Sequence, residues 1–66
     1  MKTSEARKLK IGDVLRYCGQ DGKVIGISDT TFRVRWNAAP EATYRFKSGA
    51  VAEMNKIDRE EWHGDA

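Results

Sequence analysis

The chain of 66 residues has one cysteine, one proline and one histidine, and it has no long apolar run. A single cysteine cannot form an internal disulfide, so the fold must be stable without one. A membrane-spanning helix needs ~20 consecutive apolar residues, which the sequence does not contain. The basic stretch at residues 1–10 lacks the apolar segment of a secretory signal. These absences predict a cytoplasmic protein with no membrane partner.

The single histidine and cysteine also offer little for catalysis or metal binding. His63 stands near the C-terminal end, and Cys18 has no histidine near it in the sequence. A metal site needs several converging ligands, and no phosphate-loop, zinc-protease or nucleophile-elbow motif is present. A chain of this size buries only about 60% of the surface that its unfolded form exposes, which disfavours a deep pocket. We therefore predict no catalytic residue, no metal and no cofactor.

Charge is distributed unevenly along the sequence. Residues 1–47 contain ten Lys and Arg against five Asp and Glu, whereas residues 48–66 contain two against five, and the overall formal charge is +2. A basic body with an acidic end indicates either an anionic partner or an end that neutralises its own body.

Turn residues divide the chain into five short segments of strand character. The turns are "GQDG" at 19–22, "SDTT", a loop around Pro40, and a short turn at "SGAV", while Gly26 indicates a bulge or bend within a strand. The predicted strands cover residues 14–18, 23–28, 32–37, 43–47 and, less distinctly, 52–57.

This pattern predicts an all-β domain, and the best match for its length is a small five-stranded SH3-like barrel. The predicted barrel covers residues 10–58. A flexible polar lead-in at 1–9 precedes it, and an acidic tail at 59–66 follows it. Within the tail, Trp62 is expected to dock on the domain itself.

Short motifs from Lys10 to about Asp58 resemble SH3-like domains of the Tudor and Mib/Herc2 kind. The motifs are "KIGDVLRY", "QDGKVIGI", "FRVRW" and "YRF". The resemblance implies a non-catalytic recognition module for peptides or modified side chains. The segments "GDVLR", "GKVIG" and "SGAVAEMNKI" are also similar to type II dihydrofolate reductases, which build one pore from four subunits. The strand that lines that pore is replaced here by "TYRF", so the activity is not carried over.

The segments "TFRVRWN" and "TYRFK" alternate cations with apolar residues and predict a hairpin. Pairing them symmetrically about Pro40 places Trp36 opposite Tyr44 and Val34 opposite Phe46. On the other side, the same register would oppose Arg35 to Arg45 and Arg33 to Lys47. Like charges directly opposed destabilise a sheet, so a hairpin of this kind predicts an anionic partner for its cationic side.

Two binding sites and one catalytic alternative follow from these patterns. The first site binds nucleic acid or an acidic protein surface; its predicted residues are Arg33, Arg35, Arg45, Lys47, Arg16 and Lys23. A solvated face, covered in part by acidic residues of the tail, is the competing interpretation.

The second site is a peptide groove edged by Tyr17, Trp36 and Tyr44, whose rings would otherwise belong to the core. A subunit of an enzyme built between copies of the chain is the third alternative, and it requires a homo-oligomer.

Overall fold

The computed structural model describes residues 1–37 and 40–62. His63 and the end of the predicted acidic tail lie outside the described residues. The elements, in chain order, are α1 Thr3–Ala6, β1 Val14–Tyr17, β2 Gln20–Ile27, β3 Thr31–Trp36, β4 Ala42–Arg45, α2 Gly49–Ala52, β5 Asn55–Ile57 and a 3₁₀ turn, η1, at Arg59–Glu61.

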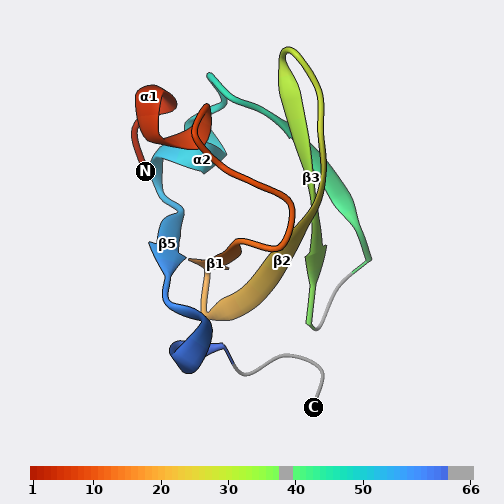
Figure 1. Ribbon diagram of the computed structural model, residues 1–66. Helices are drawn as coiled ribbons and strands as arrows, with labels where there is room; N and C mark the ends of the chain where they lie inside the picture. Colours follow the sequence, from red (N-terminus) through yellow and green to blue (C-terminus); the bar gives the residue numbers. More distant parts are fainter. Residues whose placement is uncertain (38–39, 63–66) are drawn as a thin grey trace.

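The five strands form one antiparallel sheet in the order β4-β3-β2-β1-β5. Strand β2 is twice as long as β1 and joins the β1–β5 side of the molecule to the β3–β4 side (Figure 1). In the described part of the chain the outer strands β4 and β5 do not pair with each other, so the sheet is not closed into the predicted barrel. The prediction of five antiparallel strands is confirmed.

The bulge predicted in the second strand is confirmed. Val24 pairs with Val34, but the next pair joins Gly26 to Arg33, so β2 carries one extra residue at this point. A bulge bends its strand and increases the local twist. It therefore helps the long strand to serve both sides of the sheet.

The first hairpin turn lies two residues earlier than predicted. Tyr17 pairs with Gln20, and the two residues between them have positive φ, at 51° for Cys18 and 76° for Gly19. Two successive positive values are the signature of a type I′ turn, whose twist matches that of the flanking strands. The predicted turn at 19–22 is therefore wrong, because Asp21 and Gly22 belong to β2.

The register of the β3–β4 hairpin also differs from the prediction. Phe32 lies opposite Tyr44 and Arg33 opposite Thr43, so the pairing is centred two residues before Pro40. The observed register is shifted from the predicted one by an even number of residues, so every side chain stays on its predicted face. The predicted partners are wrong, and so are the predicted Arg–Arg and Arg–Lys oppositions. Phe32, Trp36 and Phe46 are buried on the inner face, as predicted.

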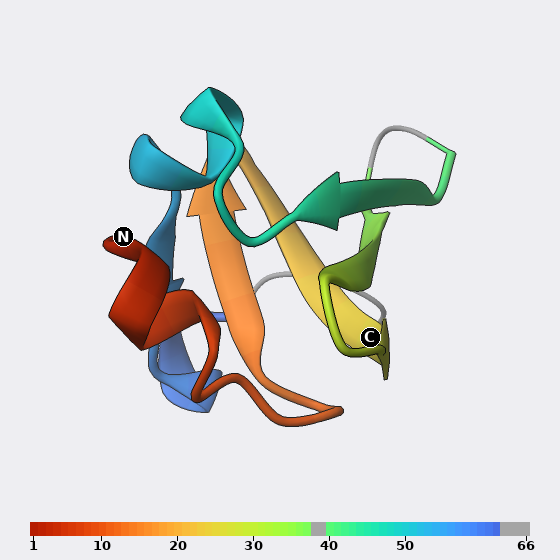
Figure 2. The ribbon, with the colours of Figure 1, turned by 90° about the horizontal axis from the view of Figure 1, so that it is seen from above.

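The first nine residues, expected to be a flexible lead-in, pack against the domain. Ala6 is fully buried and Leu9 is 6% exposed, and both belong to the core. The N-terminal ammonium of Met1 donates hydrogen bonds to the carbonyl oxygens of Ala52 (2.9 Å) and Met54 (2.6 Å). Figure 2 shows α1 and α2 on the same side of the molecule. The core therefore includes the lead-in.

Candidate nucleic-acid interface

Five of the six predicted anion-binding residues lie on one face of the sheet. Residues directly opposite each other in a ladder share a face, and the pairs here are Arg16–Asp21, Lys23–Arg35, Gly26–Arg33 and Thr31–Arg45. We call this surface the outer face, because the buried aromatic residues occupy the other side. Its cations are Arg16, Lys23, Arg33, Arg35 and Arg45.

Like charges do oppose each other on the outer face, but between β2 and β3. Lys23 and Arg35 are register partners, and the side chain of Arg35 is 62% exposed. Opposed like charges destabilise a sheet. Among residues 1–37 and 40–62, no acidic side chain forms an ion pair with Lys23. The conflict predicted for the hairpin thus exists one strand away from its predicted place.

Glu41 relieves the charge on β3 in part. Its carboxylate lies 3.6 Å from Nε of Arg33 and 3.4 Å from Nη2 of Arg35, and both arginine side chains are more than half exposed. Exposed ion pairs contribute only ~0–1 kcal/mol each. Glu41 and Asp21 are the carboxylates at the edges of this set, so five cations against two anions leave a formal excess of three positive charges.

Arg16 is committed to a structural contact. Its Nε donates to Oδ1 of Asp21 at 2.8 Å, and Asp21 is only 6% exposed. Arg16 Nη2 also donates to the carbonyl oxygen of Glu61 at 3.3 Å, which holds η1 beside the sheet. The hydrogen bond to Asp21 is the main reason that the pKa of Arg16 is raised. The side chain of Arg16 thus links the sheet to the C-terminal turn η1.

Lys47 lies beyond the end of β4, in a separate hollow of about 430 Å³. Arg45 lines this hollow too, and the guanidinium of Arg7 stands 5.7 Å from the ring centre of Phe46 at its edge. Arg45 therefore links the outer face to a second group of cations. The described acidic side chains form no ion pair with any of these three cations.

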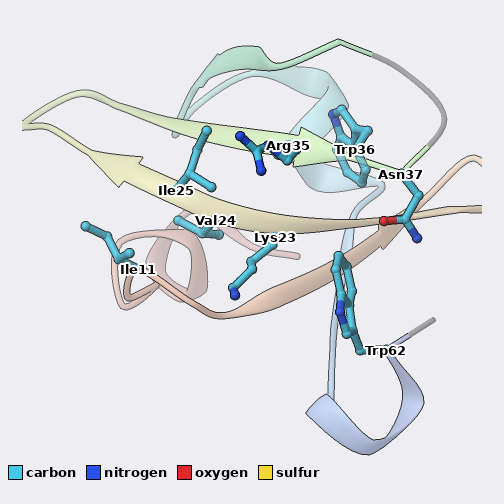
Figure 3. Close-up of a pocket in the computed structure, with 8 residues that line it drawn as sticks. All are labelled: Ile11, Lys23, Val24, Ile25, Arg35, Trp36, Asn37 and Trp62. Carbon is cyan, nitrogen blue, oxygen red and sulfur yellow. The ribbon is translucent and has the colours of Figure 1, made fainter. Parts of the chain in front are cut away.

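A hollow of about 360 Å³ lies at the centre of the outer face (Figure 3). Its lining combines apolar side chains, two cations and an amide, namely Ile11, Lys23, Ile25, Arg35, Asn37 and Trp62, with the buried residues Val24 and Trp36 below. Ile11 is 68% exposed and lies in this hollow with Ile25 and Trp62. Trp62 docks on its own domain, as predicted.

The three residues of the alternative peptide groove also come together. The ring centres of Tyr17 and Trp36 are 6.0 Å apart, and Nε1 of Trp36 donates a 2.8 Å hydrogen bond to the hydroxyl of Tyr44. They line a hollow of about 160 Å³ with Cys18 and Gln20. Trp36 is only 6% exposed, so it is mainly a core residue, while the tyrosines form the accessible rim.

The phenol of Tyr17, at the rim of this hollow, has a shifted pKa. A hydrogen bond to Cys18 and the negative charge of the cysteine thiolate raise the pKa of the Tyr17 phenol. The folded state therefore retains the phenolic proton above pH ~10, where the unfolded chain releases it. The contribution to stability is complete below pH ~10 and is lost as the pH rises through the higher folded value.

We expect Cys18→Ala to shift the Tyr17 titration towards lower pH. The change removes both the hydrogen-bond partner and the thiolate charge. Phenolate absorbance at 295 nm measures the shift, and Tyr17→Phe identifies which of the tyrosine transitions belongs to Tyr17. An unchanged titration in the Cys18→Ala variant would show that the thiol does not act on the phenol.

Sequence reasoning missed the contributions of Ile11, Asn37 and Glu41 to this surface. Ile11 had a signal of its own, because it is an isolated apolar residue in a polar turn. Asn37 had one too, because it continues the alternation of Arg33 and Arg35 along the strand. Glu41 had none, because its position beside Arg33 and Arg35 depends on the hairpin register. In the part of the chain that the structure describes, no helix could span a membrane, and no three acidic, Cys or His side chains cluster as metal ligands.

No family model, curated protein or solved structure matches the chain.

Proposed function

We propose that this domain binds nucleic acid through the outer face of its sheet. The supporting observation is the direct opposition of Lys23 and Arg35, with Arg33 and Arg45 at neighbouring register positions. The folded sheet already holds these cations close together against their mutual repulsion. A bound phosphate therefore gains charge-assisted hydrogen bonds from them without having to gather them first. An anionic polymer would relieve the repulsion between strands β2 and β3.

The continuity of the cations favours a polymer over a single small anion. Lys23, Arg35 and Arg33 follow β2 and β3, Arg45 extends the surface to β4, and Lys47 continues it past the end of that strand. Phosphates recur along a nucleic acid, so a track of cations matches several of them at once.

The proposal includes an SH3-like arrangement of the domain. A strand order in which β5 joins β1, β2 serves both sides and a short helical turn precedes β5 supports this interpretation. In such a domain the outer face of β2, β3 and β4 is available for partners.

The salt dependence of binding tests the proposal. For labelled single-stranded and duplex oligonucleotides, measured by fluorescence anisotropy, the logarithm of the affinity should fall linearly with the logarithm of KCl concentration. With four phosphates contacted the slope is about −3, since each contributes ~0.7–0.9. Lys23→Ala and Arg35→Ala should each make the slope shallower by ~0.7–0.9.

Lys56→Ala is the matched control, because it removes the same charge from β5, at the opposite edge of the sheet from β4. Its ion pair with Asp13 spans a long 3.8 Å and Lys56 is more than half exposed, so its loss should cost little stability. A salt-independent affinity, or an equal effect of Lys56→Ala, would refute the outer face as the binding surface.

The aromatic hollow supports a second candidate function, binding of a protein segment. Tyr17, Trp36 and Tyr44 surround one small hollow, and the hydroxyl of Tyr44 accepts a hydrogen bond there. Tyr17→Ala should then weaken a protein partner's binding, whereas Arg35→Ala should leave it unchanged. The hollow and the outer face lie on opposite sides of β3, so the two candidates are separable by mutation.

A further inference from the structure

The central hollow of the outer face differs from an ordinary basic surface because half of its side chains are apolar. Ile11, Ile25 and Trp62 stand beside the cations of Lys23 and Arg35, and Asn37 adds an amide. Figure 3 shows Trp62 rising from the C-terminal turn past the end of β1, on the side of the strands that carry Lys23 and Asn37, and the three side chains line one hollow. The indole of Trp62 therefore lies next to cations in one hollow, which offers an aromatic contact as well as charge.

Trp62 is held in place by the turn that precedes it. The backbone N–H of Trp62 donates to the carbonyl oxygen of Arg59 at 3.1 Å. The carbonyl oxygen of Glu61, the residue just before Trp62, accepts a hydrogen bond from Nη2 of Arg16 at 3.3 Å. Arg16 is itself fixed by Asp21. The indole is therefore presented to the hollow from a braced position, and it remains partly accessible.

The composition of the hollow matches the two parts of a nucleotide. A base stacks on an aromatic ring and on apolar side chains, while its phosphate needs cations. An asparagine amide can form hydrogen bonds with a base edge. In a duplex the bases are stacked on each other and paired, so only an unpaired base can stack on a side chain in this way.

We infer that the outer face binds single-stranded nucleic acid, with one unpaired base in the hollow against Trp62 and its phosphates on Lys23 and Arg35. This inference rests on the proposed function and adds the class of strand and the contact that selects it. Trp62 supplies stacking, and the neighbouring cations supply attraction that does not depend on sequence.

Tryptophan fluorescence and anisotropy test the inference on the full chain. Oligothymidylate should quench the emission of Trp62, and the Trp62→Leu variant measures any change in the emission of Trp36, which also borders the hollow but is only 6% exposed. Trp62→Leu should abolish the quenching and weaken binding of the single strand by about fivefold or more, the lower end of base–aromatic stacking. The salt slope should stay unchanged, because no charge is removed. Trp62→Phe, which keeps a ring, should retain most of the affinity.

The possible results separate the inference from the function on which it rests. Equal affinity for duplex and single strand, with no effect of Trp62→Leu and a steep salt slope, would overturn the inference and leave the proposed function standing. Salt-independent or undetectable binding of both nucleic acids would overturn both. If poly-glutamate binds as tightly as oligothymidylate and quenches Trp62 equally, the hollow does not select a base. Thermal melting of each variant shows that the fold survives.

Discussion

Gly22→Ala is expected to lower the free energy of unfolding by about 1–3 kcal/mol or more, a large share of the total stability of so small a domain. A Cβ atom at position 22 would lie 2.4 Å from Cε3 of Trp36 and 2.6 Å from Cγ1 of Val34. Neither neighbour has room to move, because Val34 is fully buried and Trp36 is 6% exposed and hydrogen-bonded to Tyr44. Overpacking of this kind costs ~1–3 kcal/mol, occasionally more, against a total of about 3–10 kcal/mol for a domain of this length.

Urea denaturation followed by circular dichroism measures the effect, and Gly26→Ala is the matched control. Both glycines lie in β2, but a Cβ atom at position 26 would meet only Cβ of Arg33, at an ordinary 3.6 Å. The control should change the free energy of unfolding by less than ~1 kcal/mol. Equal stabilities of the two variants would contradict the close packing of Trp36 over Gly22.

The same glycine explains why the sequence misplaces the first turn. In "GQDG" three of the four residues favour a turn, and local chemistry offers no reason to divide the segment. The structure uses the last two residues elsewhere: Asp21 pairs with Arg16, and Gly22 makes room for an indole ring. The turn falls on Cys18 and Gly19 instead. Contacts with other strands determine where the turn forms, and the four residues of the turn segment do not reveal those contacts.

The β3–β4 hairpin shows a second limit of sequence reasoning. Alternation of apolar and charged residues identifies the inner and outer faces correctly, because side chains alternate with a period of two along a strand. Alternation says nothing about even shifts of register, which leave the faces unchanged. Here the observed register places Glu41 beside Arg33 and Arg35, so attraction replaces the predicted repulsion. The residue types thus determine which face of the sheet each side chain occupies, whereas the pairing of opposite charges favours the observed register of the β3–β4 hairpin.

The candidate site was predictable as a set of cations but not as a hollow. Arg16 and Glu61 are 45 positions apart in the chain, and their contact places Trp62 against β2. No periodicity or motif encodes a contact of that separation. The mixture of apolar and cationic side chains, on which the choice of a single strand depends, therefore emerges only from the folded chain.

Trp36→Ala is expected to cost about 3–5 kcal/mol of stability, which is typical for truncation of a buried aromatic residue. The indole packs on Tyr17 and Tyr44, with ring centres 6.0 and 6.2 Å away, and its Nε1 hydrogen bond to Tyr44 would also be lost. Tyr44→Phe separates the two contributions, since it removes only the hydrogen bond and should cost ~0.5–1.5 kcal/mol. Urea denaturation measures both. Equal costs would show that the hydrogen bond, and not burial of the ring, accounts for the contribution of Trp36.

This result decides how the two candidate functions are to be tested. A variant that has lost several kcal/mol in a domain of this size is partly unfolded, so weaker partner binding by Trp36→Ala would say nothing about the aromatic groove.

The double variant Gly22→Ala with Trp36→Leu tests directly how the ring of Trp36 packs on Gly22. Leucine removes the clash of the added methyl group with the indole ring but leaves its clash with Cγ1 of Val34. The double variant should therefore still be more stable than the sum of the single changes predicts, with a coupling of ~0.5–3 kcal/mol for residues in contact. Strict additivity would mean that the ring of Trp36 contributes nothing to the cost of Gly22→Ala.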